Sequence, residues 1–339
     1  AIEAKKPIGL FGDYDVDGAC SAALFSLCLA QFGVQVFFHI PDRFNEGYGP
    51  NTKALLQLAE QGAELVLTVD CGITAHAPLE AAAQAGIPVI VIDHHKAGPV
   101  LPQAQAVVNP NRLDYDSQLG SLCAAGVCFL VLAGVLRECR NRNIPTLSGQ
   151  QVQLLDLLDL VALATVCDVM PLSGLNRVFV KQGLKVLSKR QNTGLKTLMD
   201  TAKIDHMPNA YSLGFILGPR INAGGRLGNS SIGVQLLCAS DRDIAQSLAW
   251  HLDELNTQRQ HIEKQVRAQA EEMAFSQLDE NPNRHVLVLA HEGWHEGVLG
   301  IVAGRLKEKL NKIVIVISLD EEGTGKGSAR SVSGFSLGD

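Results

Sequence analysis

The sequence predicts an α/β protein, with a mostly parallel sheet covered by helices and a smaller second α/β domain. Between residues 8 and 95, short β-branched runs alternate with longer Ala- and Leu-rich segments of helical spacing. Such alternation requires crossover connections, which make neighbouring strands parallel and place helices on both faces of the sheet. The same alternation begins again after about residue 285. A chain of 339 residues is long enough for two domains with separate cores.

The strands and helices of the first domain are bounded by consistent local signals. Apolar runs of strand length occupy 8–11, 34–40, 65–69 and 89–92, and segments with helical spacing occupy 19–32, 51–61 and 75–85. A glycine directly follows each helical segment, at Gly33, Gly62 and Gly86. Glycine is favoured there because the C-terminal cap of a helix often adopts a left-handed conformation.

The rest of the chain is predicted to be helical up to a second, smaller alternation. Residues 121–190 have a mainly helical pattern, and a proline-free segment from 240 to about 278 predicts one long connecting helix. The second alternation consists of a strand at 285–290, a helix at 298–310 and a strand at 313–318. We expect a first domain at 1–239, in which residues 1–115 are α/β and residues 116–239 are mainly helical. A connecting helix at 240–282 and a second domain at 283–339, incomplete at its C-terminus, are expected to follow.

Composition narrows the class of protein. The net charge of −6 argues weakly against a general nucleic-acid binder, since such proteins are usually basic. No apolar run reaches the length of a membrane span, and no basic-then-apolar signal segment opens the chain. The eight cysteines contain no CxxC pair, which is typical of small buried hydrophobes in a reducing compartment. We therefore expect a cytoplasmic protein with no membrane partner.

Acidic side chains follow the predicted strands at their carboxyl ends. Asp15 and Asp17 follow the first strand, Asp70 ends the third, and the triplet 93–95 (Asp, His, His) ends the fourth. A further acid, Asp168, ends a buried helical run. A single aspartate in such a position is usually a turn or helix cap. Because ligands bind outside the carboxyl ends of parallel strands, four acids and a histidine pair at that edge indicate a metal site instead.

The ligand types narrow the choice of metal and of chemistry. Mixed Asp and His ligands without thiolates suit Mn²⁺, with Mg²⁺, Fe²⁺ or Zn²⁺ as alternatives, and exclude a structural zinc site. Five or six such ligands are enough for two ions that share a bridging carboxylate. Two adjacent metals are the usual arrangement for hydrolysing a phosphate ester.

Four segments, DYDVDG, VDCG, DHH and CDVMPL, occur here in the order found in the DHH phosphoesterase superfamily. The resemblance is strongest to its bacterial exonucleases that are specific for single-stranded DNA, and it extends over nearly the whole chain. Further matches are VVNPN (107–111), LCAAGVCF (122–129), GPRINAGGRLG (218–228), GVLGIVAGRL (297–306) and GSARSVSG (327–334). The second domain resembles the DHH-associated domain, DHHA1. The resemblance thus implies a DHH domain and a DHHA1-like domain joined by a long helix.

The resemblance also implies roles for individual residues. The metal ligands would be Asp15, Asp17, Asp70, His94 and Asp168, with Asp70 bridging two ions of Mn²⁺ or Mg²⁺. His95 would face the scissile phosphate, Asp13 and Asp93 would orient ligands, and a metal-activated water would be the nucleophile. Ser328 and Arg330 match an element that binds the 5′-terminal phosphate. Arg220, Asn222 and Arg226 match a loop that contacts the nucleic acid near the site.

The implied activity is a 5′-to-3′ exonuclease that releases mononucleotides from single-stranded DNA in repair and recombination. The implied protein is a monomer that works with a single-stranded-DNA-binding protein and a helicase. One departure concerns Phe11, since many superfamily members have a histidine at that position. We therefore expect one of the two metals to be held weakly.

Two other functions fit parts of the pattern. One is a phosphoesterase of the same superfamily that acts on short oligoribonucleotides, cyclic dinucleotides or nucleoside bisphosphates. The other is a non-catalytic binding module, as some replication-fork relatives are, although those have typically lost the acids that this chain keeps.

Three further patterns have simpler explanations. HEGWH at 291–295 fits the zinc-protease motif HExxH, but its glycine and its position after a strand predict a loop. GTGKGS at 323–328 lacks the spacing of an ATP-binding loop. Seven cations and Asp200 give 177–203 a local charge of +6. That basic face is either an ordinary solvated surface or a track for a DNA backbone.

Overall fold

Five parallel strands form one sheet in the computed structural model, which describes residues 1–337. The spatial order is β2-β1-β3-β4-β5, and every neighbouring pair is parallel. The strands are β1 (Ile8–Gly12), β2 (Val36–His39), β3 (Leu65–Val69), β4 (Val89–Ile92) and β5 (Ala106–Val108). This confirms the predicted class. The edge strand β5 was not predicted, because three residues before an Asn-Pro pair are too short to show a period.

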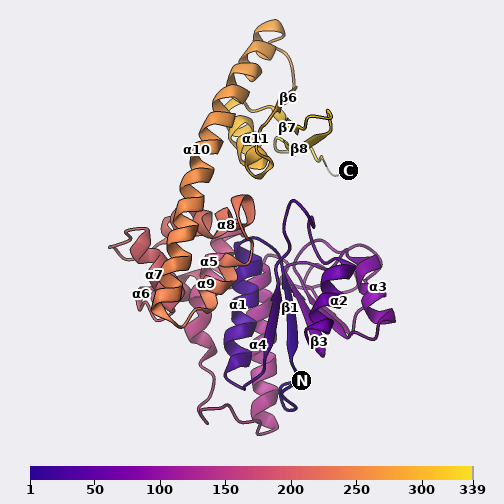
Figure 1. The fold of residues 1–339 in the computed structure, drawn as a ribbon, viewed down its shortest axis with the longest axis vertical. Coiled ribbons are helices and arrows are strands. Elements are labelled where there is room, and N and C mark those ends of the chain that lie inside the picture. Colours follow the sequence, from indigo (N-terminus) through magenta and orange to yellow (C-terminus); the bar gives the residue numbers. More distant parts are fainter. Residues whose placement is uncertain (338–339) are drawn as a thin grey trace. The chain divides into compact units, whose positions relative to one another are not determined.

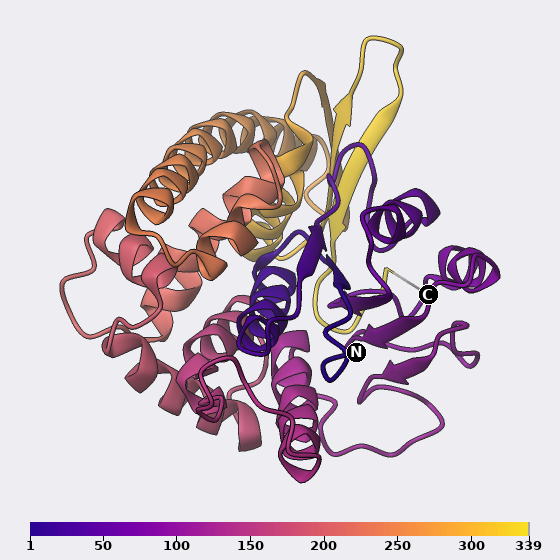
Figure 2. The ribbon, with the colours of Figure 1, turned by 60° about the horizontal axis from the view of Figure 1, so that its bottom comes forward.

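Helices cover both faces of this sheet (Figures 1 and 2). On one face lie α1 (Val16–Ala30) and α4 (Ala124–Asn141), and on the other lie α2 (Thr52–Glu60) and α3 (His76–Gln84). One apolar cluster packs strand residues against both α2 and α3. Its members include Phe11, Leu55, Leu58, Val66, Leu79, Val89 and Val91. The three central strands, β1, β3 and β4, are therefore largely buried on both faces, which explains why they are almost purely apolar.

A helical layer extends the same unit beyond α1. It contains η1 (Leu154–Leu157), α5 (Leu158–Cys167), α6 (Gly174–Ser188), α7 (Thr193–Thr201), the π-helix η2 (Ser212–Leu217), α8 (Gly218–Leu227) and α9 (Ile232–Cys238). The helix α5 is apolar and buried along most of its length, and it packs against α1 and α6. Packing against α1 places the C-terminal end of α5, with Asp168, near the start of α1.

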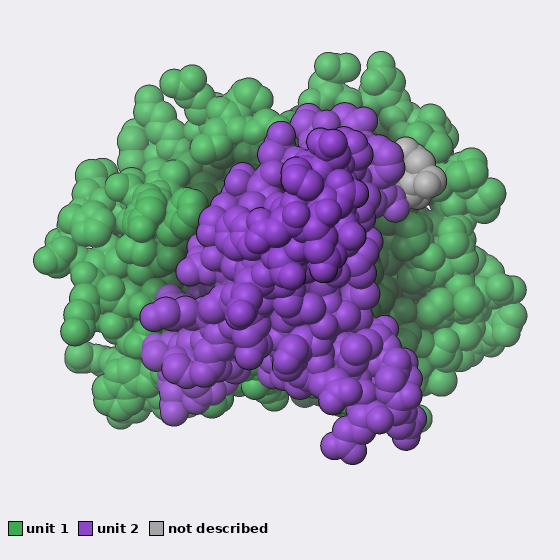
Figure 3. Space-filling view, turned by 90° about the horizontal axis from the view of Figure 1, so that it is seen from above, with its two compact units in different colours: residues 1–253 green, residues 254–339 purple. Residues whose placement is uncertain are grey.

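The chain divides into two compact units within the long helix α10 (Arg242–Glu280), with unit 1 covering residues 1–253 and unit 2 residues 254–339 (Figure 3). Unit 2 contains β6 (Val286–Glu292), α11 (Glu296–Leu310), β7 (Ile313–Leu319) and β8 (Gly325–Arg330). Of the domain predicted at 283–339, Gly338 and Asp339 lie outside the described residues. The domain boundaries predicted at residues 239 and 283 stay predictions.

Unit 2 has its own three-stranded sheet, in the order β6-β7-β8. The strands β6 and β7 are parallel, whereas β8 is antiparallel to β7 and was missed because GKGSAR lacks an apolar period. Residues 293–295 form the loop between β6 and α11, so HEGWH is not on a helix, as predicted. Within residues 1–337, no helix is both long enough and apolar enough to cross a membrane.

Close packing of α6 on α5 depends on Gly183. A β-carbon at that position would lie 2.2 Å from the carbonyl oxygen of Leu158 and 2.4 Å from Cβ of Ala162. We predict that Gly183→Ala lowers the free energy of unfolding by about 1–3 kcal/mol, because the two helices must separate.

The matched control is Gly134→Ala in α4, where an added β-carbon would meet nothing within 4 Å. This variant should be as stable as the parent or gain about 0.5–1 kcal/mol from its higher helix propensity. Urea denaturation of both variants measures the difference. Equal stability of the two would contradict the packing argument.

Candidate metal centre

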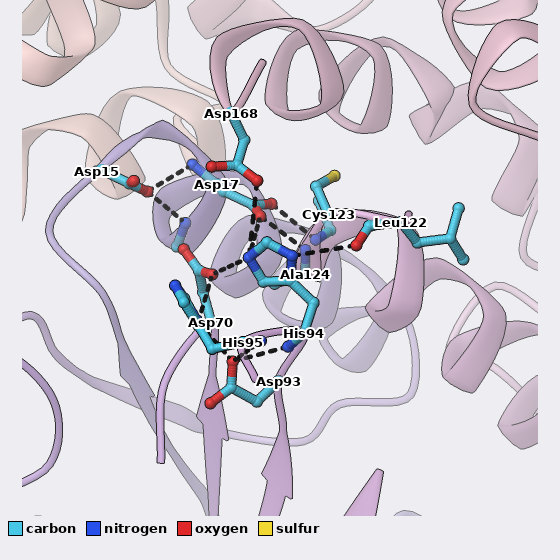
Figure 4. Close-up of polar contacts among 12 residues, drawn as sticks. Asp15, Asp17, Asp70, Asp93, His94, His95, Leu122, Cys123, Ala124 and Asp168 are labelled. Carbon is cyan, nitrogen blue, oxygen red and sulfur yellow. Dashed lines mark hydrogen bonds and ion pairs between the residues drawn. The ribbon is translucent and has the colours of Figure 1, made fainter. Parts of the chain in front are cut away.

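The carboxyl ends of β1, β3 and β4 carry a cluster of aspartates and histidines. These three strands are neighbours in the sheet. After β1 the chain adds β2 on one side of it, and then adds β3, β4 and β5 on the other side, so the strand order switches direction at β1. A crevice at such a switch point is the usual ligand site of an open parallel sheet. Side chains from all three strand ends, together with Asp168 from the end of α5, point toward one another there (Figure 4).

Asp15 and Asp17 lie at the start of α1 and have different partners. Asp15 is the N-cap of α1, and its carboxylate accepts hydrogen bonds from the amides of Asp17 (2.8 Å) and Gly18 (3.1 Å). A β-carbon on Gly18 would lie 2.4 Å from the carbonyl oxygen of Asp13, so this tight loop requires glycine. The loop thereby holds both acids at the mouth of the crevice.

The buried carboxylate of Asp17 is bound to the N-terminus of a second helix. Its two oxygens accept hydrogen bonds from the amides of Ala124 (2.6 Å) and Ala125 (2.8 Å), in the first turn of α4. Cys123, the N-cap of α4, makes no capping bond with its own side chain. Asp17 therefore supplies the negative charge that the helix N-terminus favours, and it joins α1 to α4.

Asp70 and His94 lie at the middle of the cluster. Asp70 has a left-handed backbone (φ +61°) directly after β3, and its buried Oδ1 has no hydrogen-bond donor. Nε2 of His94 lies 3.3 Å from that oxygen, 3.6 Å from Oδ2 of Asp168 and 3.8 Å from Oδ2 of Asp17. Nδ1 of His94 lies 3.1 Å from the carbonyl oxygen of Leu122, which can only accept a proton. Nε2 is thus left with its lone pair toward the acids, as in metal-binding histidines.

Asp93 holds the histidine pair in place. Its Oδ1 accepts hydrogen bonds from the amides of His94 (2.7 Å) and His95 (3.1 Å), and its Oδ2 accepts one from Ile73 (3.0 Å). Nδ1 of His95 lies 2.8 Å from the same Oδ1. With its oxygens engaged in this way, Asp93 orients the histidines.

Three buried carboxylate oxygens in the cluster have no donor, namely Oδ1 of Asp13, Oδ1 of Asp70 and Oδ2 of Asp168. Leaving buried polar atoms unpaired is costly unless a cation satisfies them. The possible ligand atoms form three groups, and the atoms of each group lie within 4.8 Å of one another. The groups are Asp13, Asp15 and Asp70; Asp17, His94 and Asp168; and Asp70, His94 and His95. Oxygen and imidazole donors of this kind fit divalent cations such as Mn²⁺ or Mg²⁺.

Asp70 belongs to two of these groups, once with Asp13 and Asp15 and once with His94 and His95, so the groups are adjacent. The sequence placed Asp13 outside the ligand shell, as a residue that orients ligands. The structure groups a carboxylate oxygen of Asp13 with those of Asp15 and Asp70, and Oδ1 of Asp13 is buried without a donor, which makes Asp13 a candidate ligand.

Crowding and burial alter the pKa values of these groups. Burial, then the charges of Asp15 and other nearby acids, raises the pKa of Asp17 well above its usual value, and burial and the neighbouring acids do the same to Asp70. Burial and Asp15 raise the pKa of Asp13 to about 8 and that of Asp168 to about 6. Without a cation, the cluster therefore retains protons at neutral pH.

The two histidines are shifted in opposite directions. Burial, assisted by the charge of His95, lowers the pKa of His94, so its ring is neutral and able to bind a cation. The hydrogen bond that Nδ1 of His95 donates to Asp93 outweighs burial and raises the pKa of His95. Burial alone would raise the pKa of Asp93, but the hydrogen bond and charge of His95 and the amide of Ile73 hold it below its usual value.

The predicted contact residues of unit 1 lie on a helix, where a loop was expected. Arg220, Asn222 and Arg226 are all in α8, whose Pro219 is tolerated in the first turn. A β-carbon on Gly225 would lie 2.8 Å from the carbonyl oxygen of Tyr14, so the glycines of this segment allow α8 to approach the aspartate loop closely. Nε of Arg220 donates to Asp253 (2.8 Å).

In unit 2, Ser328 and Arg330 lie together on β8. Nη1 of Arg330 donates to Oγ of Ser328 (2.9 Å). A β-carbon on Gly300 of α11 would lie 3.0 Å from Nη2 of Arg330 and 3.1 Å from Oγ of Ser328. The absence of a side chain on Gly300 therefore leaves room for this pair beside α11.

Some contacts of the centre were not anticipated. The ring of Phe11 stacks on that of His39 (5.2 Å between centroids) and is fully buried. The hydroxyl of Tyr48 lies 3.3 Å from the carbonyl oxygen of Asp70 and 3.3 Å from the ring nitrogens of His95. Backbone groups of residues 122–125 bind His94 and Asp17, and the sequence does not reveal them because every residue type has a carbonyl and all but proline have an amide hydrogen.

Comparison with known proteins gives a consistent result. Residues 7–165 match the model of the DHH family, N-terminal domain, and residues 283–339 match that of the DHHA1 domain. The chain is 40% identical over its full length to the single-stranded-DNA-specific exonuclease RecJ of Dickeya dadantii, and 41% identical over 97% of its length to RecJ of Escherichia coli. It spans 60% and 58% of those two relatives.

A solved structure also matches. It is described as exonuclease RecJ bound to manganese, and it superimposes with a TM-score of 0.80 at 35% identity, covering 98% of this chain and 80% of the other.

The pKa shifts predict how pH affects the stability of the metal-free protein. Asp13 and Asp168 titrate near 8 and 6 when folded, and an unfolded aspartate titrates near ~3.9. Folding therefore binds protons between these values, and stability falls as pH rises from about 5 to about 8, by a few kcal/mol. Thermal unfolding in EDTA measures this loss, and Asp13→Asn should make the dependence shallower.

A divalent cation should reverse this trend. The cation competes with protons for the same oxygens, so the increase in melting temperature that it causes should grow with pH. If the melting temperature in EDTA rose between about pH 5 and 8, the carboxylates would not be crowded as described.

Proposed function

This chain belongs to the DHH family, and on that premise we propose that it is a metal-dependent 5′-to-3′ exonuclease acting on single-stranded DNA. The observation that carries the proposal is the convergence of buried, unpaired carboxylate oxygens and Nε2 of His94 on two adjacent positions. The full-length similarity to RecJ exonucleases supports the choice of substrate. On the same grounds we assign it to DNA repair and recombination in the cytoplasm, as a monomer that works with a single-stranded-DNA-binding protein and a helicase.

The proposed ions are two of Mn²⁺ or Mg²⁺, as hard oxygen donors with one or two imidazoles suggest. Asp17, His94 and Asp168 would hold one ion, Asp13 and Asp15 the other, and Asp70 would serve both. When bound, the ions supply Lewis-acid activation of the phosphodiester and of the attacking water. Position 11 is a phenylalanine, whose ring stacks on that of His39, so no imidazole ligand comes from this position. We therefore propose that the second ion is held less tightly.

His95 is proposed to stabilise negative charge on the scissile phosphate. Its side chain is 45% exposed, and Asp93 both orients its ring and raises its pKa. Because the raised pKa favours the protonated ring, His95 would present a positive charge at the edge of the metal centre. Arg220, Asn222 and Arg226, on the helix beside the aspartate loop, are proposed to contact the strand next to the cleaved bond.

The direct test is a time course on long single-stranded DNA, labelled at one end, with Mn²⁺ present. Mononucleotides that appear progressively from a free 5′-phosphorylated end, and not from a blocked one, are the expected result. No cleavage of the long strand, with rapid hydrolysis of a dinucleotide, would replace the proposal with a phosphoesterase of small substrates. Binding without any hydrolysis would favour a non-catalytic module.

Asp70 provides the sharpest test of the site. Asp70→Asn removes the shared charge while keeping the shape, so we predict loss of metal binding and at least a ~10³-fold loss of cleavage. Calorimetric titration with Mn²⁺ and the cleavage assay measure the two effects separately.

Asp159→Asn is the matched control, because Asp159 is also buried but lies at the opposite end of α5 from Asp168. It should bind Mn²⁺ like the parent protein. Retained cleavage in the Asp70 variant would contradict the site assignment.

Arg330 is proposed to bind the 5′-terminal phosphate together with Ser328. A hydrogen bond to a charged group contributes about 1.5–3 kcal/mol, so Arg330→Gln should lower kcat/KM for a 5′-phosphorylated strand by about 10- to 100-fold. The effect on a strand with a 5′-hydroxyl should be much smaller. Lys312→Gln removes the same charge elsewhere in unit 2 and should change neither value. Equal losses on both strands would argue against 5′-phosphate recognition by Arg330.

A further inference from the structure

The helix α6 presents a row of cations on its outer face. Arg177, Lys181, Lys185 and Lys189 follow one another at every fourth residue, on and just beyond α6. All four are exposed. Among residues 1–337, none of their side chains forms an ion pair or hydrogen bond with another residue. We call these four residues the α6 stripe.

The opposite face of α6 keeps the stripe turned outward. Phe179, Val180, Gly183, Val186 and Leu187 are buried, and Gly183 lies directly against the start of α5. Because this face is closely packed, the helix cannot rotate about its axis. The cations are therefore held in one line, where they do not neutralise acids of the protein.

Along the sequence, the charge on and near the stripe is almost entirely positive. Between Asp168 and Asp200 the sequence contains no acidic residue, and Asp200 is itself paired with Arg190. An ordinary solvated helix face usually carries charges of both signs, often as pairs four residues apart. A one-sign row in a protein of net charge −6 therefore needs a partner with negative charge.

The stripe begins beside the metal centre. Asn176, next to Arg177, donates to the carbonyl oxygen of Ser121 (2.7 Å). The following residue, Leu122, accepts from His94. Since α6 runs antiparallel to α5, the stripe leads away from the end of α5 that carries Asp168.

We propose that the α6 stripe binds the sugar–phosphate backbone of the single strand as it leaves the metal centre. This inference rests on the proposed function for the identity of the strand. Four residues of helix rise about 6 Å, so the cations are spaced on the scale of successive phosphates in a stretched strand. The whole row extends over about 18 Å, enough for several phosphates. No exposed aromatic residue lies on α6, so the contact is electrostatic and independent of sequence.

The test measures binding without catalysis. The variant Lys181→Gln/Lys185→Gln/Lys189→Gln and the parent are titrated with a fluorescent oligothymidine in EDTA, over a range of salt concentrations. Each phosphate contact contributes about −0.7 to the slope of log K against log salt for a single strand, so the triple variant should lose about 2 units of slope. Because no metal is present, this result can be read even if the protein proves not to be a nuclease.

The matched control is Lys53→Gln/Arg137→Gln/Arg140→Gln, which removes three exposed cations elsewhere in unit 1. Both variants have the same net charge, and glutamine keeps the helix propensity of lysine. Only the stripe variant should show a smaller slope of log K against log salt. Equal losses would mean that overall charge, and not the stripe, attracts the strand, and this would overturn the proposal.

Two further measurements support the test, and the first of them does not depend on the folding of the variant. In the unmodified protein, bound oligothymidine should protect Lys181, Lys185 and Lys189 from acetylation, while Lys53 stays reactive. In cleavage assays, the stripe variant should show a higher KM for long strands and an unchanged kcat for a trinucleotide too short to reach the stripe. Unchanged slope and unprotected stripe lysines would overturn the proposal and leave an acidic protein surface as the partner.

Discussion

Mutual repulsion among buried carboxylates is the constraint on which unit 1 depends. Asp13, Asp17, Asp70 and Asp168 are brought to one edge of the sheet, where burial and the charges of neighbouring acids raise their pKa values. Such a cluster can persist only if other groups compensate for it. The amides at the start of α1 and α4 provide some of that compensation, and a pair of divalent cations would provide the rest.

One short segment, residues 121–125, connects the elements that must stay in register. The carbonyl oxygen of Ser121 fixes the start of α6, that of Leu122 sets the proton of His94, and the amides at 124 and 125 bind Asp17. The orientation of a metal ligand, the junction of two helices and the origin of the α6 stripe therefore depend on the same stretch of backbone. A displacement there would disturb all of them together.

Charge is distributed unevenly over the molecule, and the net value hides this. The acidic centre contributes strongly to the total of −6, while the α6 stripe is locally basic. The sequence-based argument that an acidic chain is a poor nucleic-acid binder therefore carries little weight here. The proposed cleavage of a phosphodiester would need negative charge to hold cations and positive charge to hold the strand, and the acids at the sheet edge and the α6 stripe would supply these.

Much of the fold and of the site could be predicted, because the signals are local. The period of apolar residues predicted β1 to β4 and the elements of unit 2 up to β7, and a long proline-free segment predicted α10. Strand ends placed Asp15, Asp17, Asp70 and His94 at one edge. The short strand β5, the glycine-rich β8 and the helix α8 were not predicted, since their sequences lack a clear period.

The finer design of the site required the tertiary structure. Asp17 meets Ala124 across 107 residues of sequence, and its partner is a backbone amide that every residue type except proline offers. Likewise, only the folded chain brings a carboxylate oxygen of Asp13 close to those of Asp15 and Asp70. Sequence determined which side chains reach the edge of the sheet, because strand periodicity is local. Tertiary structure decided which of them share a cation, because that depends on distances between distant segments.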